Sequence, residues 1–288
     1  MGLFFAAKDV SNKSQASSCE IRRARKTLCE PLLKWAGGKR RLLPKILRFV
    51  PVTEGRYFEP FLGGGAVFFS RQPKSALLSD SNPELINAYV QVRDDLGAVV
   101  RHLRGLPNSE ADYYRIRASS PRSPAGRAAR LIYLCTLSFN GIYRQNLIGE
   151  FNVPYGQKTH LSPCDLPKLK EISAALSGRR IEVLDFGKAV RRAKGGDVVY
   201  FDPPYTVAHG NNGFVKYNAR IFSWADQVRL AKLARRLKRR GVYVFVSNAD
   251  HPSIRKLYSG FAAKTMGRHS AMAASSEYRR LVRECLFF

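Results

Sequence analysis

The sequence predicts an α/β fold in which a helical segment interrupts a mostly parallel sheet. Short apolar runs rich in β-branched and aromatic residues alternate with stretches of helical periodicity before residue 95 and after residue 186. Such alternation favours parallel strands with helices on both faces of the sheet. The stretch from 95 to 186 lacks this alternation and shows helical spacing instead, as in AGRAARLIYLCTLSF.

Two strands are expected in the first half of the chain. RYFEPF (56–61) predicts a strand that runs into the glycine-rich turn LGGGA and then a helix. SALLSD (75–80) predicts a second strand, which ends on Asp80. The next helix is expected to open on SNPE (81–84), which combines capping residues, a proline near the first helical position and an acid in the first turn.

The second half repeats the pattern. DVVYF (197–201) predicts a buried strand, and Ser223 with Asp226 marks the start of a helix that Gly241 ends. VYVFVSN (242–248) predicts another buried strand. The tail RRLVRECLFF predicts a final strand, which we expect to pair with the segment before residue 270.

The middle of the chain is interpreted as an insertion, although ordinary crossovers of the main fold would also account for it. Asn140-Gly141 marks a turn, and GEFNVPYG predicts a loop or hairpin. The expected organisation is a flexible basic leader (1–30), the first part of the sheet domain (31–94), a helical insertion (95–186) with a hairpin near 139–157, and the second part of the sheet domain (187–288).

The charge balance predicts a polyanionic partner. Lys and Arg number 49 against 22 Asp and Glu, which gives a formal net charge of +27, and the sequence pI is about 10.3. A field of this sign and size attracts nucleic acid, because phosphates are the commonest partners of strongly basic domains. A basic surface that only keeps the protein in solution would give the same charge balance.

Other compositional features exclude several classes. The five cysteines are odd in number, form no Cys-x-x-Cys pair and accompany scattered histidines, so neither a disulfide framework nor a metal site is expected. No apolar run approaches the roughly 18 residues of a membrane span. The start MGLFFAAKDV lacks the basic region of a signal peptide. We therefore expect a cytoplasmic protein with no membrane partner.

Three expected strand ends carry residues suited to ligand binding, and parallel sheets bind ligands outside the carboxyl ends of their strands. The ends are GGG (63–65), Asp80 and DPPY (202–205). A glycine turn lets the backbone approach a ligand closely, and an acid after the second strand suits ribose hydroxyls. This predicts a nucleoside-containing cofactor. Val67 and Phe68 follow where a dinucleotide fingerprint needs its third glycine, which argues against NAD.

The DPPY segment is a rigid array of hydrogen-bond acceptors beside an aromatic face. Pro203 and Pro204 cannot donate hydrogen bonds and hold φ at about −65°, so the carbonyls here are expected to be free. Asp202 only accepts when it is ionised. With Tyr205, the array is complementary to a flat group that bears an NH₂. A strand that simply ends in a turn, with Asp202 as a cap, would explain the same residues without a ligand.

The chain resembles the Dam-like, D12 class of DNA adenine methyltransferases. Asp-Pro-Pro-Tyr is the catalytic motif of amino-methyltransferases that modify the exocyclic nitrogen of adenine in DNA. The resemblance runs from about 31 to 288 in the family's order. It covers PLLKWAGGKRRLLP (31–44, cofactor motif), FEPFLGGGAVFF (58–69, glycine-rich motif), LSDSNPELINAY (78–89, acidic motif), FNGIYRQNLIGEFNVPYG (139–156, target-recognition hairpin), and RHS (268–270) with the later VREC (closing segment).

The resemblance implies methyl transfer from S-adenosylmethionine to adenine N6 in double-stranded DNA, with base flipping and without a metal. It implies a mixed, mostly parallel Rossmann-like methyltransferase sheet with an inserted helical target-recognition domain, and it is compatible with a cognate restriction endonuclease as a separate chain. Asp202 and the Pro203 carbonyl would accept hydrogen bonds from N6, and Tyr205 would stack on the base. By position, the implied sites are catalytic Asp202, Pro203, Pro204 and Tyr205; cofactor-binding Trp35, Lys39, Phe61, Gly63, Gly65, Asp80 and Asp202; and DNA-binding Phe139, Asn140, Arg144 and Asn146.

Several of these residues also have a purely structural explanation. The Lys- and Arg-rich stretch 229–240 could follow the DNA backbone or form a solvated helix face. The remaining structural explanations are Trp35 as a core aromatic, Lys39 as a surface cation, Asp80 as a helix cap, Phe139 as a core residue, Asn140 as a turn former and Arg144 as a phosphate contact.

The target sequence and the reaction have rivals. Family members that methylate GATC often carry tyrosine where this chain has Phe139 and a basic residue where it has Gln157, so GATC is one candidate among several. Other candidate reactions are methylation of cytosine N4, of adenine in RNA or of a protein glutamine. A catalytically dead DNA-binding protein is the rival from another class, against which the intact Asp80 and DPPY segment count.

Overall fold

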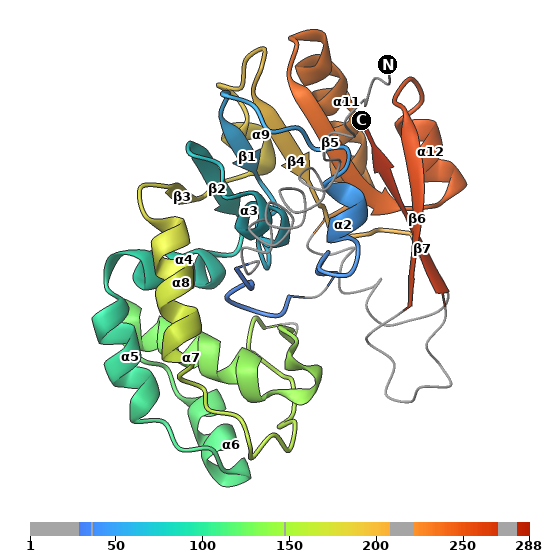
Figure 1. Cartoon of the computed structure of the whole chain (residues 1–288). Coiled ribbons are helices and arrows are strands. Elements are labelled where there is room, and N and C mark those ends of the chain that lie inside the picture. Colours follow the sequence, from blue (N-terminus) through green and yellow to red (C-terminus); the bar gives the residue numbers. More distant parts are fainter. Residues whose placement is uncertain (1–28, 36, 147, 208–221, 270–280) are drawn as a thin grey trace, which may run out of the picture.

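The computed structural model describes residues 29–35, 37–146, 148–207, 222–269 and 281–288 (Figure 1). Within this part, seven strands form one sheet in the order β3-β2-β1-β4-β5-β7-β6. The first five are parallel, and β7 runs antiparallel to both β5 and β6. The predicted mixed, mostly parallel sheet is therefore confirmed. The strands are β1 (Tyr57–Glu59), β2 (Ala76–Asp80), β3 (Arg180–Val183), β4 (Val198–Phe201), β5 (Tyr243–Ala249), β6 (Ala263–His269) and β7 (Leu281–Phe287).

Helices begin where the capping residues predict. The Asn82 side chain accepts hydrogen bonds from the backbone N–H groups of Glu84 and Leu85, and Ser223 and Asp226 form a capping box. The helices are α2 (Leu43–Ile46), α3 (Ala66–Arg71), α4 (Pro83–Asp94), α5 (Leu96–Arg104), α6 (Glu110–Ala118), α7 (Pro124–Leu137), the 3₁₀ turn η1 (Phe139–Gly141), α8 (Leu166–Leu176), α9 (Phe186–Ala189), α11 (Trp224–Arg239) and α12 (Pro252–Leu257).

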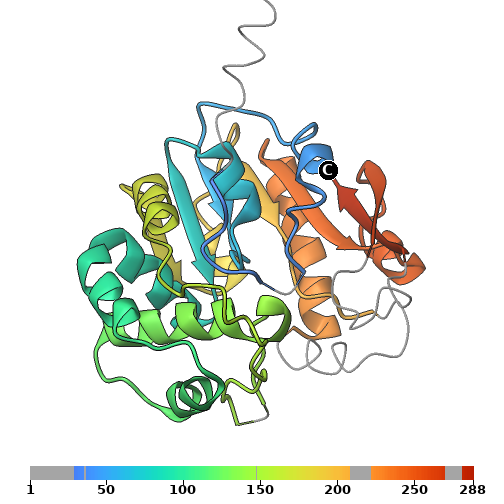
Figure 2. The ribbon, with the colours of Figure 1, turned by 60° about the horizontal axis from the view of Figure 1, so that its bottom comes forward.

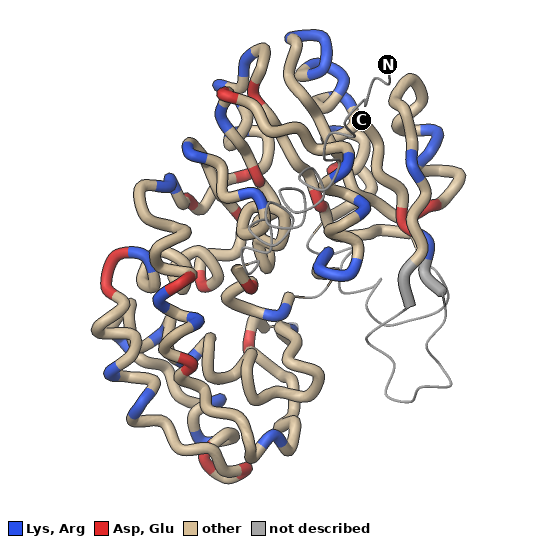
Figure 3. The backbone as a smooth tube through the Cα atoms, viewed as in Figure 1, with Lys and Arg blue, Asp and Glu red and all other residues tan. Residues whose placement is uncertain are grey.

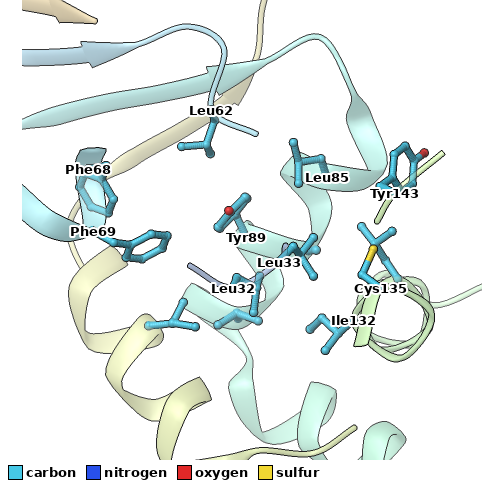
Figure 4. Close-up of a cluster of buried hydrophobic side chains, with 14 of the residues drawn as sticks. Leu32, Leu33, Leu62, Phe68, Phe69, Leu85, Tyr89, Ile132, Cys135 and Tyr143 are labelled. Atoms are coloured by element: carbon cyan, nitrogen blue, oxygen red, sulfur yellow. The ribbon is translucent and has the colours of Figure 1, made fainter. Parts of the chain in front are cut away.

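The sheet is covered by apolar side chains on both faces. Because successive residues of a strand point to opposite faces, Val198 and Tyr200 of β4 enter one core, and Val199 and Phe201 enter the other. The first core continues from the sheet into the helices of the middle segment, and it contains both Tyr89 of α4 and Ile132 of α7 (Figure 4). The middle segment therefore packs directly on the sheet.

Helices α5 to α8 lie together below the β2 and β3 side of the sheet in Figure 1. One strand interrupts the range 95–186 that the sequence assigns to the insertion. Arg180–Val183 pairs in parallel with β2 and so belongs to the sheet. The strand has four residues, and Arg180 and Val183 at its two ends are exposed, which is common at a sheet edge and hides a strand from pattern analysis. The sheet thus resumes at residue 180, and the division into domains stays a prediction.

The carboxyl-terminal strand lies inside the sheet. Strand β7 pairs with β6, as the tail sequence predicts, and on its other side with β5. The register places Glu284 opposite Ala249, the last residue of β5. An acidic side chain is thereby brought to the edge of the sheet where the parallel strands end.

Among the described residues, no helix has both the length and the apolar character that a membrane crossing requires.

Candidate active site

The three predicted strand ends meet at one edge of the sheet. Strands β2, β1 and β4 are neighbours and parallel, so their carboxyl ends lie side by side. This brings together the glycine turn after β1, Asp80 at the end of β2 and Asp202 after β4. The segment leading to α2 crosses in front of this edge in Figure 2, where it is drawn in dark blue. We call this side of the sheet the catalytic edge.

A buried lysine connects the catalytic edge to that segment. Lys39 is 3% exposed, and its Nζ lies 2.7 Å from Asp202 Oδ1 and 3.6 Å from Glu284 Oε2. The same Nζ donates to the carbonyl of Gly37 at 2.7 Å. The explanation of Lys39 as a surface cation is therefore wrong. A buried ion pair needs such additional partners, because each charge has lost its hydration.

Glu284 also holds the tyrosine of the DPPY segment. The Tyr205 hydroxyl donates to Glu284 Oε2 at 2.7 Å, and Lys39 Nζ lies 5.0 Å from the centre of the Tyr205 ring. Burial, with the Glu284 charge next, holds the pKa of Tyr205 well above its usual value, so this hydroxyl remains a donor at neutral pH. Glu284 was not predicted from the sequence. A single acid inside the apolar strand LVRECLFF was the signal that could have identified it.

The two proline carbonyls differ. Gln227 Nε2 donates to the Pro204 carbonyl at 3.3 Å, and Asn248 Nδ2 donates to Gln227 Oε1 at 3.0 Å. The prediction that the carbonyls here are free is thus wrong for Pro204, because a buried amide on α11 reaches back to it. The Pro203 carbonyl accepts no hydrogen bond from the part of the chain that the structure describes. It is the oxygen of this pair that remains available to a ligand.

The glycine turn passes closely under Trp35. A Cβ atom on Gly63 would lie 2.8 Å from Trp35 Cδ1, and Gly63 has a φ of 45°, so both space and backbone conformation require glycine there. Gly65 also has positive φ, at 65°, and caps α3. The Trp35 ring stacks on Tyr143, with 4.6 Å between ring centres and 13° between planes. Trp35 therefore joins the turn to the segment 139–157.

Asp80 fixes the turns that follow β1 and β2. Its Oδ2 accepts from the Gly63 N–H at 3.1 Å, and its Oδ1 accepts from the Asn82 N–H at 3.0 Å. Burial raises the pKa of Asp80, and these backbone donors oppose that rise. The helix cap of α4 is Asn82, so Asp80 is not merely a cap. Nearby, the Phe61 ring stacks on Phe186 with 5.4 Å between ring centres.

A second buried acid lies beneath the glycine turn. Glu59 Oε2 accepts from the Tyr57 hydroxyl at 2.7 Å and from the Phe68 N–H at 3.1 Å. Burial, together with the charge of Asp202, raises the pKa of Glu59 to about 8 against the opposing effect of its two donors. At pH 7 this carboxyl is therefore mostly neutral. Glu59 belongs to the glycine-rich motif FEPFLGGGAVFF, but its residue type and spacing give no indication of its protonation.

Glu59→Gln should change the pH dependence of stability. The folded-state pKa lies above the unfolded value, so the wild-type contribution is fully present below about pH 4.5 and is lost as the pH rises towards 8. We expect the free energy of unfolding of the variant, relative to wild type, to rise by about 3 kcal/mol from pH 5 to pH 8. Urea titrations at both pH values measure this. Glu54→Gln, at an exposed position, is the control, and a constant difference for Glu59→Gln would contradict the assignment.

The segment 139–157 presents some of its predicted DNA-binding residues and uses others internally. Bridges join Ser138 to Tyr155 and Gln145 to Phe151. The four predicted DNA-binding residues differ in their exposure and in their contacts within the segment. Phe139 is 44% exposed and so is not a core residue, and Asn140 has a left-handed φ of 55° in the turn. Arg144 Nε donates to Asn152 Oδ1 at 2.8 Å. The Asn146 side chain accepts from the backbone N–H groups of Ile148 and Glu150.

Within the described ranges, no group of three or more His, Cys, Asp or Glu side chains is arranged to hold a metal ion. Four cysteines in these ranges have free thiols, namely Cys29, Cys135, Cys164 and Cys285. Residues 1–28 of the basic leader, which include Cys19, lie outside the described residues. The segment 270–280 between β6 and β7, which includes Ser270 of the RHS motif, also lies outside them.

Comparison with known proteins identifies the family. The family model of the D12 class N6 adenine-specific DNA methyltransferases matches residues 35–272 of this sequence. The chain belongs to this family. Among its relatives, a type II methyltransferase of Lactococcus lactis subsp. cremoris is 38% identical over 89% of this chain and 94% of its own length. The DNA adenine methylase of Escherichia coli strain K12 is 32% identical, covering 88% of this chain and 93% of its own length.

A third relative, the DNA N-6-adenine-methyltransferase of Escherichia phage P1, is 34% identical over 88% of this chain but only 35% of its own length. The sequence-based prediction of a DNA adenine-N6 methyltransferase is thereby confirmed. The D12 class membership accounts for the conjunction of the glycine turn, Asp80 and the DPPY segment at one sheet edge.

Proposed function

We propose that this D12 methyltransferase takes its methyl group from S-adenosylmethionine bound at the catalytic edge. The residues present fit such a ligand. Gly63 leaves no room for a side chain under Trp35, and the two backbone bonds to Asp80 leave further acceptor positions on its carboxylate for ribose hydroxyls. When bound, the donor supplies an activated methyl group on a sulfonium. The residues proposed to hold it are Trp35, Lys39, Phe61, Gly63, Gly65, Asp80 and Asp202.

The proposed chemistry depends on Asp202 and Pro203. The observation that carries the proposal is the 2.7 Å ion pair between Lys39 and Asp202, which orients the carboxylate at the end of β4. Asp202 and the Pro203 carbonyl would accept hydrogen bonds from the two N–H groups of the adenine amino group. These bonds favour development of the nitrogen lone pair, because they withdraw the N–H groups from the plane of the base. Positioning of this kind supplies much of the rate in a transfer between two bound partners.

Tyr205 would stack on the adenine once the base has left the duplex. Flipping costs a few kcal/mol of lost stacking and pairing, which an aromatic platform partly offsets. The hydrogen bond from Tyr205 to Glu284 orders the tyrosine before DNA arrives. Less ordering entropy is then lost on binding. Pro204 would act through its carbonyl bond to Gln227, which fixes the path of the segment.

The proposed substrate is a short sequence in double-stranded DNA, for which GATC is one candidate. Arg144 would read a guanine edge, Phe139 would occupy the place of the flipped base, and Asn140 and Asn146 would contact or support contacts to neighbouring bases.

The proposed division is a catalytic domain over 31–94 and 187–288 with a target-recognition domain over 95–186. We also propose that the enzyme acts in the cytoplasm. A cognate restriction endonuclease as a separate chain is supported by the type II name of a relative.

A binding measurement tests the cofactor proposal. Labelled S-adenosylmethionine is titrated into the protein, with S-adenosylhomocysteine and NAD as competitors. We expect one saturable site that S-adenosylhomocysteine displaces and NAD does not. No saturable binding, with or without duplex DNA, would sink the proposal.

Arg144→Ala should relax the sequence preference of methylation. Loss of a bidentate guanine contact costs about 1–3 kcal/mol at one position, whereas a lost phosphate contact weakens binding to all sequences equally. Methylation of a library of randomised duplexes, read by sequencing, separates the two effects. Arg104→Ala, at an exposed position of α5, serves as the control. Unchanged preference combined with uniformly weaker binding would make Arg144 a phosphate contact only.

A further inference from the structure

The edge of the sheet opposite the catalytic edge carries a concentrated positive charge. Helix α11 joins the two edges: Gln227 in its first turns contacts Pro204, and its 16 residues extend over about 24 Å to Arg239. There the turn after α11 touches the loop before β4, because Gly196 N–H donates to the Gly241 carbonyl at 3.0 Å. The loop before β1 joins them through a hydrogen bond from Arg56 to the Arg192 carbonyl.

These adjoining segments form what we call the far-edge surface. Its cations are exposed, and within the described part of the chain none of them forms an ion pair with an Asp or Glu side chain. Lys238 Nζ donates to the main-chain oxygen of Phe288 at 3.0 Å. Figure 3 shows the blue of Lys and Arg along the top of the molecule, where these segments lie. The surface consists of Arg191, Arg192, Lys194, Lys238, Arg239 and Arg240.

Acidic residues do not balance this charge. Asp197, in the middle of the surface, is 1% exposed and already paired with Arg56 at 2.8 Å and with the Lys194 backbone N–H at 2.9 Å. The remaining carboxylate of the adjoining loops is exposed Glu54, one negative charge against six cations. Crowded like charges repel one another and reduce the stability of the fold. A bound polyanion would neutralise this repulsion.

The residue types favour duplex DNA as that polyanion. Four of the six cations are arginines, whose planar guanidinium groups bind phosphate oxygens in pairs. The segments that bear them are fixed by backbone hydrogen bonds at the ends of α11 and β4, so the backbone that carries the cations is ordered. Tyr243, 49% exposed at the start of β5, adds an aromatic side chain at the same edge. A rigid array of this kind suits the regular phosphates of a duplex.

We propose that the far-edge surface binds a second segment of duplex DNA through its phosphates while the catalytic edge holds the target segment. The two edges face opposite ways along α11, so one straight duplex cannot lie against both. This goes beyond the proposed function and does not depend on the methyl donor. A protein that holds two segments can pass from one to the other without leaving DNA, since such contacts are independent of sequence.

The test counts duplexes per chain. Native mass spectrometry of the full chain with excess short duplex is expected to show one protein bound to two duplexes. Charge reversal at Arg191, Arg192, Arg239 and Arg240 to Glu should weaken the second binding step at least about tenfold, because several phosphate contacts are lost. Methylation of a single short duplex should stay within about twofold of wild type. The matched control reverses Arg101, Arg104, Arg122 and Lys170, four exposed cations elsewhere.

A milder set, with glutamine at the same four far-edge positions, repeats the measurement without introducing repulsion, so a folding defect in the charge-reversed set does not prevent a decision. The proposal is overturned if wild type binds only one duplex per chain. It is also overturned if the control set loses the second duplex as fully as the far-edge sets do. A second site that prefers single-stranded RNA to duplex DNA would contradict the assigned partner.

Discussion

Replacement of Asp202 by alanine should lower methyl transfer by about a thousandfold or more while leaving most DNA binding intact. The variant loses the proposed acceptor for the adenine amino group and also the partner that Lys39 contacts at 2.7 Å. Removing a positioned catalytic group or an electrostatic contact to the reacting atoms typically has effects of this size. DNA affinity depends mainly on surface cations, so the salt dependence of DNA binding by the variant should be nearly the same as that of wild type. Single-turnover transfer with labelled donor measures the loss.

Asp94→Ala is the matched control for that experiment, because Asp94 is an exposed acid of α4 that pairs only with the adjacent Arg93 among the described residues. It should transfer methyl groups at the wild-type rate. If Asp202→Ala retained more than about a tenth of the wild-type rate, the carboxylate would not be the acceptor that the mechanism requires.

Lys39→Met should be among the most destabilising single changes in the chain and should also inactivate the enzyme. Two carboxylates, Asp202 and Glu284, would then lie buried or nearly so without the cation between them. Breaking a buried ion pair by removing one partner costs about 3–5 kcal/mol. Urea unfolding at pH 7 measures this loss.

The control for Lys39 is Lys45→Met. Lys45 is exposed on α2 and donates to the Gly267 carbonyl at 3.3 Å, so its loss should cost less than about 1 kcal/mol. Equal stability of Lys39→Met and Lys45→Met would show that the Lys39 network contributes nothing to the fold.

Local chemistry was enough to predict most of the scaffold. The strand ends at Asp80 and Asp202, the caps at Asn82 and Ser223 and the glycine turn follow from residue types at short spacing, which determine backbone conformation directly. The resemblance to the D12 class then supplied the reaction, and the family match over residues 35–272 agrees with it.

Contacts between distant segments could not be predicted in the same way. Glu284 reaches Tyr205 only because β7 inserts antiparallel beside β5, and a register is not visible in either strand alone. The burial of Lys39 depends equally on the segment that crosses the catalytic edge. The short strand β3 was missed because its polar residues resemble a loop. Gln227 was unremarkable in sequence, yet it occupies one of the two proline carbonyls.

The central claim is that the DPPY segment, held by Lys39 and Glu284, methylates adenine N6 at one short DNA sequence. It is tested by incubating plasmid from a methylase-deficient host with the purified protein and labelled S-adenosylmethionine, and by mapping modified bases with single-molecule sequencing. We predict N6-methyladenine at one short motif, for which GATC is one candidate, and none with Asp202→Ala. Methyl groups on cytosine, or equal modification by Asp202→Ala, would contradict the account.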